Sequence, residues 1–334
     1  MRGGWALGFQ VGSICFGLVF TLCASLSCLA SPATSKLLWL VPPGAQIVAG
    51  FENYRDEHHH GQLLLTTRNN RLDLADWQAI AGVDHERNIE EVIQVAASPV
   101  GGELPEHLLL VAGRFDREKI FRSLRMNGTD RAEHEGKPVM LIEPFAREMG
   151  VMKGTRWLII LENRVAMLGT PSMVRIALHR YVNRADVDMV LRERLSQLPL
   201  DVNSWNVLSS LPKARTEYTT SQATSPWARF FEGADVLMVG ARFGAKIRVH
   251  FALHADENRG ANFFTQKPAS FAEVFGAARV GRSRVPRVAN VEVRQDRVQG
   301  SVQLSRKQFD AWSDWTNNFG HAPAVPERQM AAGQ

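Results

Sequence analysis

The chain has 334 residues, of which 45% are hydrophobic and 22% are charged. This balance is typical of a globular protein and excludes a disordered or fibrous chain. The net charge of +5 comes from basic residues that are spread along the chain. Nucleic-acid binding needs a clustered basic face, so we expect no nucleic-acid partner. A small surplus of this kind fits residence near an anionic membrane surface.

The first 30 residues have the pattern of an export signal. Arg2 is followed by a run of apolar or small residues from Trp5 to Ala30. A short positive start, an apolar run and small residues at its end are typical of a cleaved signal, here cut after Ala30 or Ala33. The run is also long enough to span a bilayer, which needs about 20 apolar residues, so a retained anchor stays open. Lipidation of Cys28 is the third alternative. All three predict an exported protein, in the periplasm or on the extracytoplasmic face of the membrane.

The cysteines lie in this leader, at Cys15, Cys23 and Cys28. A chain cut after Ala30 therefore has no cysteine, and packing alone must stabilise it. A catalytic thiol and a cysteine zinc site are excluded for that chain, and no cofactor is expected.

The first predicted half covers residues 37–200. Apolar alternation and short apolar runs predict strands at 47–51, 62–67, 89–97 and 107–113. Helices are predicted at 73–82 and 116–128, the second with Asp116 as its N-cap. In residues 155–169, Glu162 and Asn163 turn one strand into the next. A helix then begins with Thr170 as N-cap and Pro171 at its first position.

The second predicted half covers residues 201–318. It contains a strand near 205–210 and a hairpin about Gly244 within 235–256. A helix is expected within 261–279, and a second hairpin turns at residues 295–296 within 288–305. A closing helix is predicted at 306–318, and residues 319–334 read as a flexible tail.

The alternation of strand residues predicts the fold class. In the segment from Ile247 to Leu253, every second side chain, beginning with Ile247, is apolar and points to one side. Arg248, His250 and His254 point to the other side. Strands with one apolar and one polar face belong to antiparallel sheets. We therefore predict an α+β fold with a largely antiparallel sheet or sheets, built from strand-strand-helix units whose helices cover one face.

The segment "DEHHH", residues 56–60, raises the question of a metal site. On an extended chain His58 and His60 point to one side and can share a metal, whereas His59 points away. A third ligand would have to come from elsewhere, for example from His85 or His107. The sequence contains no HExxH motif, so the preferred interpretation is a solvated loop between two strands.

Other motifs point weakly to chemistry. "SLPK" at 210–213 follows a strand and lacks the companion motifs of penicillin-binding enzymes, and no phosphate-binding glycine loop occurs. Five arginines in the C-terminal quarter predict an alternative anion-binding or lipid-headgroup surface. They are Arg282, Arg284, Arg287, Arg294 and Arg297.

Four stretches resemble a group of uncharacterised exported bacterial proteins. They are "LLWLVPPGAQIVAGFE", "LLTTRNNRLDLADW", "HLLLVAGRFDREKIFRSL" and "WLIILENRVAMLGTPSMVRIAL". The likeness rests on turns and helix starts, so it implies export and a folded domain but no site residues.

The main hypothesis is an exported envelope protein that binds or scaffolds, without catalysis, an envelope protein or an anionic surface. The alternative hypothesis is a metal-dependent hydrolase that uses His58 and His60 together with a distant acid.

Overall fold

The computed structural model describes residues 32, 35–52, 89–97, 106–126, 129–142, 155–209, 234–255, 288–294 and 297–310. Its strands are β1 (Ile47–Glu52), β2 (Ile89–Ala97), β3 (Glu106–Gly113), β4 (Asp130–His134), β5 (Lys137–Ile142), β6 (Arg156–Leu161), β7 (Val165–Gly169), β8 (Ser204–Ser209), β9 (Ala234–Arg242), β10 (Ile247–Ala255), β11 (Val288–Val293) and β12 (Arg297–Leu304). Its helices are the short 3-10 helix η2 (Leu38–Leu40), α4 (Arg117–Met126), α5 (Pro171–Val182) and α6 (Met189–Ser196). The described C-terminal end adds a helical turn at 306–310.

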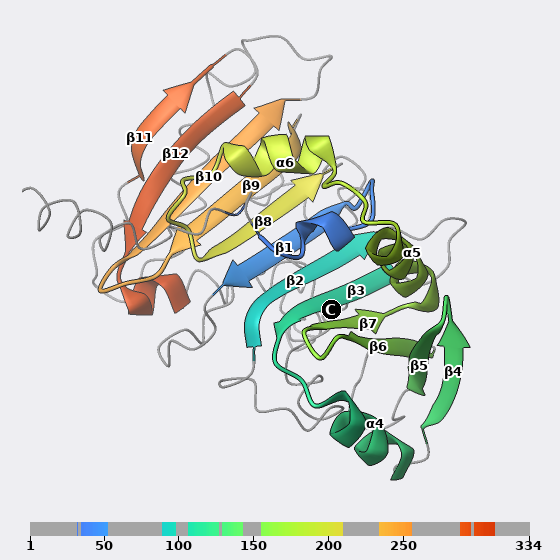
Figure 1. Ribbon diagram of the computed structural model, residues 1–334. Coiled ribbons are helices and arrows are strands. Elements are labelled where there is room, and N and C mark those ends of the chain that lie inside the picture. Colours follow the sequence, from blue (N-terminus) through green and yellow to red (C-terminus); the bar gives the residue numbers. More distant parts are fainter. Residues whose placement is uncertain are drawn as a thin grey trace, which may run out of the picture.

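These strands form one twelve-stranded sheet in the order β11-β12-β10-β9-β8-β1-β2-β3-β7-β6-β5-β4 (Figure 1). Every neighbouring pair in that order is antiparallel. The predicted α+β class and the antiparallel sheet are therefore confirmed.

Strand β1 joins the early and late parts of the chain. Val48 pairs with Val95 of β2 on one side and with Val207 of β8 on the other. One sheet thus runs through both predicted halves. The division at residue 200 stays a prediction.

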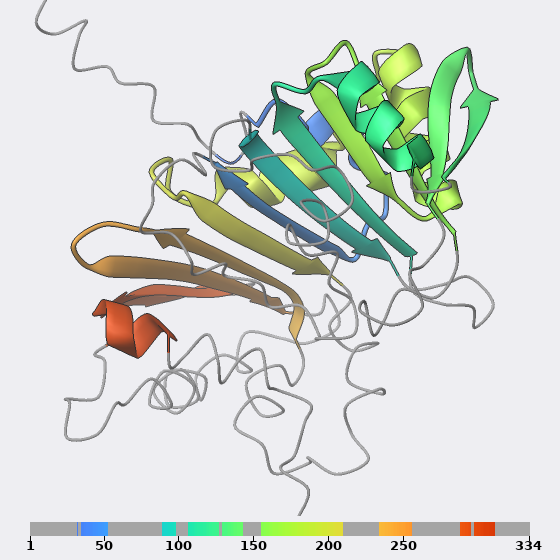
Figure 2. The same cartoon turned by 90° about the horizontal axis from the view of Figure 1, so that it is seen from below.

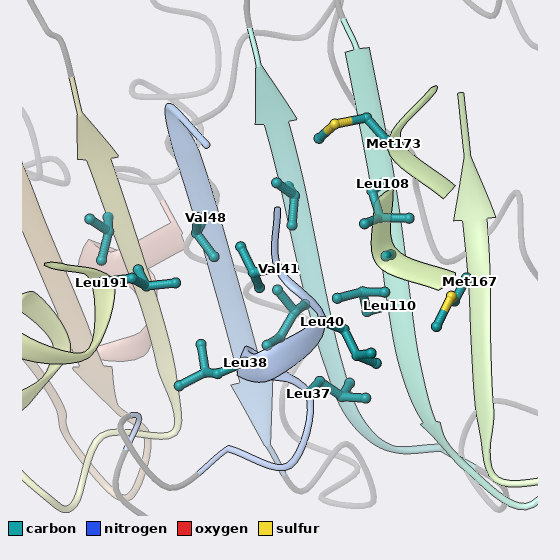
Figure 3. Close-up of a cluster of buried hydrophobic side chains, with 14 of the residues drawn as sticks. Leu37, Leu38, Leu40, Val41, Val48, Leu108, Leu110, Met167, Met173 and Leu191 are labelled. Carbon is teal, nitrogen blue, oxygen red and sulfur yellow. The ribbon is translucent and has the colours of Figure 1, made fainter. Parts of the chain in front are cut away.

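One face of the sheet carries the larger core, which η2, α5 and α6 cover. Leu38 and Leu40 of η2 are almost fully buried over Val48 of β1 and Leu110 of β3 (Figure 3). Figure 1 shows α6 over the β8 side and α5 over the β3 side of this face. The apolar segment Leu37–Val41 therefore belongs to the core of the fold.

Residues just before η2 are hydrogen-bonded to Glu91 of β2. Its carboxylate accepts hydrogen bonds from the Ser35 hydroxyl and, at 3.1 Å, from the backbone N–H of Lys36. Burial raises the pKa of Glu91, although these hydrogen bonds oppose the rise. The carboxylate thus fixes the point at which the chain enters the core.

The opposite face carries a second core, beneath α4. Ile120, Phe121 and Leu124 of α4 are buried in one cluster with Leu109 of β3 and Leu158 of β6. Neighbouring strand residues point to opposite faces, and Leu108 and Ile159 belong to the first core. Hence the expectation that helices cover one face only is not confirmed. The strand-strand-helix unit is likewise not established.

Several predicted turns and caps are confirmed. Glu162 and Asn163 take the left-handed conformation, with φ of 50° and 55°, between β6 and β7. The Asp116 carboxylate accepts a hydrogen bond from the Lys119 N–H at 3.0 Å, as an N-cap does. Pro171 is the first residue of α5, after Thr170.

Several predictions fall outside the described residues. They are the leader at 1–30, the strand at 62–67, the helices at 73–82 and 261–279, most of the helix at 306–318, and the tail at 319–334. In the described ranges, no helix is both long and apolar enough to cross a membrane.

Candidate binding site: a buried histidine and arginine

His107 at the start of β3 and Arg156 at the start of β6 lie on the same face of the sheet. Strand β7 runs between them, and its Gly169 pairs with Leu108 on one side and with Trp157 on the other. The next residue, Thr170, therefore falls between His107 and Arg156. Two strand spacings separate the Cα positions of the histidine and arginine by about 10 Å. We call these two side chains the basic pair.

The close approach of β7 to β3 depends on Gly169. A Cβ at this position would lie 2.3 Å from the carbonyl oxygen of His107 and 2.9 Å from Cα of Leu108. With only a hydrogen there, the N–H of Thr170 donates to the His107 carbonyl oxygen at 2.9 Å. The Thr170 hydroxyl donates to the same oxygen at 3.4 Å. Gly169 therefore sets the backbone that carries the basic pair.

Both side chains of the basic pair are buried, and each residue is only 7% exposed. Among the residues that the structure describes, Nε of Arg156 has no hydrogen-bond partner. No ion pair to a described carboxylate involves this guanidinium. Arginine stays protonated in proteins, and a buried charge without a counter-charge costs several kcal/mol.

The electrostatics of the pair favour a single positive charge. Burial, and then the nearby charge of Arg156, lower the pKa of His107 to about 4. Burial also lowers the pKa of Arg156. At neutral pH, His107 is therefore an uncharged imidazole beside a guanidinium. A guanidinium offers a planar fork of N–H donors that matches a carboxylate or a phosphate.

The metal ligands predicted at His58 and His60 lie outside the described residues, as does His85. His107 is described, and it lies beside Arg156 rather than among acids. The part of the chain that the structure describes contains no group of three His, Cys, Asp or Glu residues that could hold a metal ion.

Of the five arginines predicted to bind anions, Arg294 and Arg297 are described. Arg294 is exposed and forms an ion pair with Glu292, with Nη2 and Oε1 2.6 Å apart. Arg297 donates from Nη1 to Oε1 of Gln197 at 3.3 Å. Each of these two arginines thus has a partner within the chain, whereas Arg282, Arg284 and Arg287 lie outside the described residues.

The polar side chains on one face of strand β10 also have a hydrogen-bond partner within the chain. His254 lies opposite Arg297 on β12, and its Nε2 is 3.0 Å from the same Oε1 of Gln197. His250 lies on the same strand, two residues before Ala252. It is half-buried, and this burial lowers the pKa of its imidazole.

Sequence reasoning did not single out Arg156. The available signal was its position: Arg156 precedes Leu158 and Ile160 at intervals of two, so it begins an apolar strand face. His107 precedes Leu109 and Val111 in the same way. A charged or polar residue at the start of such a face indicates burial of that group.

Comparisons with known proteins are few. No protein-family model matches the chain, and no curated protein matches it. The solved structure of TP0453, in its crystal form I, is similar at a TM-score of 0.48 and 12% sequence identity. The match covers 84% of this chain and 97% of that chain.

Proposed function

We propose that this protein is an exported protein of the bacterial envelope that binds an anionic ligand without catalysis. The basic pair of His107 and Arg156 is its binding site in this proposal. The leader, with its three alternative fates, motivates the export.

The observation that carries the proposal is the buried guanidinium of Arg156. A charge removed from water needs a partner of opposite charge or several hydrogen bonds. The described residues give its Nε none. An oxyanion placed there would neutralise the charge and accept hydrogen bonds from the guanidinium.

The neighbouring groups fit recognition of the same oxyanion. An uncharged imidazole at His107 has one N–H donor and one acceptor nitrogen. Surrounding apolar residues such as Leu109 and Leu158 keep water away, which strengthens a charged hydrogen bond. The site therefore supplies one positive charge and directional donors in an apolar setting.

The binding test measures thermal unfolding of the protein recovered from the envelope after expression with its own leader. The probes are sodium acetate and inorganic phosphate, each compared with sodium chloride at matched ionic strength. We expect one oxyanion to raise the Tm of the wild type and of Arg192→Gln but not that of Arg156→Gln. Arg192 is an exposed arginine of α6 and serves as the matched control.

An equal response of Arg156→Gln and the wild type would contradict the proposed site. No response of the wild type to either oxyanion would also contradict it. Export is tested separately, by fractionation of the native host and N-terminal sequencing of the mature protein. Recovery of the protein from the cytoplasm would contradict export.

A further inference from the structure

A row of apolar side chains continues from His107 across the sheet, on the face that carries the basic pair. Ala96 of β2 lies directly opposite His107, and Ile47 of β1 lies opposite Ala96. Leu208 of β8 lies opposite Ile47 on the other side of β1. Residues directly opposite one another on antiparallel strands point to the same face. We call Ala96, Ile47 and Leu208 the apolar row.

The apolar row begins beside His107 and runs across the strands rather than along one of them. Strands β3, β2, β1 and β8 lie side by side in that order (Figure 2). Neighbouring strands are about 4.8 Å apart, so Leu208 lies about 14 Å from His107. The alkyl chain of a medium-length fatty acid can extend over such a distance.

The far end of the apolar row is accessible. Ile47 and Leu208 are half-buried, whereas their neighbours on the opposite face, Val48 and Val207, are almost fully buried. Ala96 is 7% exposed, and its methyl group occupies less space beside His107 than a leucine or valine side chain would. An apolar ligand chain can therefore cover the row by burying surface that the chain itself leaves accessible.

The basic pair and its neighbours carry one positive charge. Arg156 is charged, whereas His107 is uncharged at neutral pH. The described neighbours of the pair on this face are Ala96, Thr170 and Ile142, which lies opposite Arg156 on β5, and none of these three is charged. A monoanion balances a single buried charge, whereas a dianion would leave a second buried charge uncompensated.

We propose that the ligand of the basic pair is a monocarboxylate with an extended apolar chain, such as a medium-length fatty acid. This inference rests on the proposed function and names the class of its ligand. The carboxylate pairs with the guanidinium of Arg156, which offers parallel N–H donors. The chain lies along the apolar row, and each methylene group that leaves water there favours binding.

Three other ligand types satisfy only part of this arrangement. Acetate balances the charge of Arg156 but leaves the apolar row in water. An alkyl phosphate covers the row, but its phosphate carries about 1.5 to 2 negative charges at pH 7. A neutral alcohol of the same length covers the row and leaves the guanidinium without a counter-charge. These three types therefore serve as comparison probes.

The test is isothermal titration calorimetry of the exported protein at pH 7 with sodium decanoate, below the concentration at which it forms micelles. We expect decanoate to bind about a hundredfold more tightly than acetate, because its longer chain buries more methylene groups. Decyl phosphate and decanol are each expected to bind about tenfold more weakly than decanoate, because neither matches the single charge.

Leu208→Asn places an amide in the apolar row and leaves the basic pair intact. We expect it to weaken decanoate binding about tenfold and to leave the response to acetate unchanged. Leu141→Asn is the matched control, because Leu141 is a half-buried residue of β5 that packs against the core of the opposite face. Leu208→Ala is a milder change that should act in the same direction, and circular dichroism of each variant shows whether the sheet is retained.

The outcomes separate this inference from the proposed function. Decanoate that binds no more tightly than acetate, while both depend on Arg156, would overturn the inference and leave the proposed function standing. Equal affinities of Leu208→Asn and Leu141→Asn for decanoate would overturn the role of the apolar row. Tighter binding of decyl phosphate than of decanoate would overturn the choice of a monocarboxylate. Binding of decanoate that Arg156→Gln leaves unchanged would contradict the proposed function itself.

Discussion

Two pairs of a histidine and an arginine lie in opposite halves of the sheet, and they differ in what surrounds them. His254 and Arg297 both contact Oε1 of Gln197, which follows α6. His107 and Arg156 lie on either side of Thr170. Nε of Arg156 and Nε of Arg297 both lack an acceptor among the described residues, but Arg297 also donates from Nη1 to Gln197.

The difference separates a structural role from a binding role. In the first pair, both side chains contact one amide oxygen of a residue that follows a covering helix. That pair therefore has a structural role within the chain. The second pair keeps a buried charge whose Nε has no acceptor among the described residues, and the proposal assigns an external oxyanion as its partner. Four changes test this contrast, from the largest expected effect to the smallest.

Gly169→Ala disturbs the backbone beneath the His107–Arg156 pair. Its Cβ would lie 2.3 Å from the His107 carbonyl oxygen, so β7 has to move away from β3. We expect the free energy of unfolding to fall by about 3 kcal/mol in urea denaturation. Gly244→Ala is the control, because the nearest atom to its added Cβ is the Lys246 carbonyl oxygen at 3.7 Å. Equal effects of the two substitutions would contradict the role of Gly169.

Arg156→Met removes the buried charge and keeps much of the side-chain volume. We expect the unliganded protein to gain about 2 kcal/mol of unfolding free energy, because the described residues supply no counter-charge that would be lost with the guanidinium. Arg297→Met, which removes a partner of Gln197, is expected to destabilise the protein instead. Chemical denaturation of both variants compares the pairs directly, and a large loss of stability in Arg156→Met would mean that Arg156 is internally paired.

Gln197→Leu removes the acceptor that His254 and Arg297 share. Buried or half-buried donors that lose a partner cost about 1–2 kcal/mol, and we expect a loss of this size in urea denaturation. Ser196→Ala changes the neighbouring exposed residue and is expected to have little effect. A neutral Gln197→Leu variant would show that the amide oxygen does not hold this pair.

Lowering the pH protonates His107, the titratable member of the His107–Arg156 pair. Its pKa is about 4 in the folded protein, below its usual value of 6.5, so the unfolded chain binds more protons between these values. The contribution of His107 to the free energy of unfolding is therefore fully present above pH 6.5 and is lost as the pH decreases towards 4. We expect a loss of about 1 kcal/mol between pH 7 and pH 5.5 from this residue.

The measurement is the difference in unfolding free energy between pH 7 and pH 5.5 for the wild type and two variants. His107→Gln should lack this part of the pH dependence, whereas His179→Gln, at an exposed position of α5, should keep it. An oxyanion bound beside His107 would raise its pKa and reduce the loss. An unchanged pH dependence in His107→Gln would contradict the assignment.

Much of the local structure was predictable because it depends on neighbouring residues. The turn at Glu162 and Asn163, the cap at Asp116 and the helix start at Pro171 each rest on short-range backbone preferences. The short helices were harder. The Asp188 side chain caps α6 by accepting from the Leu191 N–H at 2.9 Å, but no apolar period marks this helix clearly.

The candidate site was not predictable in the same way. His107 and Arg156 each begin an apolar strand, and each signal can be read in the sequence. Their meeting depends on β7 lying between β3 and β6, and that order is set by hydrogen bonds between distant segments. The histidine-rich segment at 56–60 suggested a metal site by its composition, but composition does not determine which side chains lie close together in the fold.

By itself, the sequence determined the positions of turns and caps, the α+β class and the antiparallel character of the strands, because alternation and backbone preference act over a few residues. The tertiary structure alone decided that β1 joins β8, that both faces carry a core, and that an arginine is buried beside His107. These outcomes depend on the joint burial of apolar side chains that are far apart in the chain, and no local sequence pattern specifies which of them pack together.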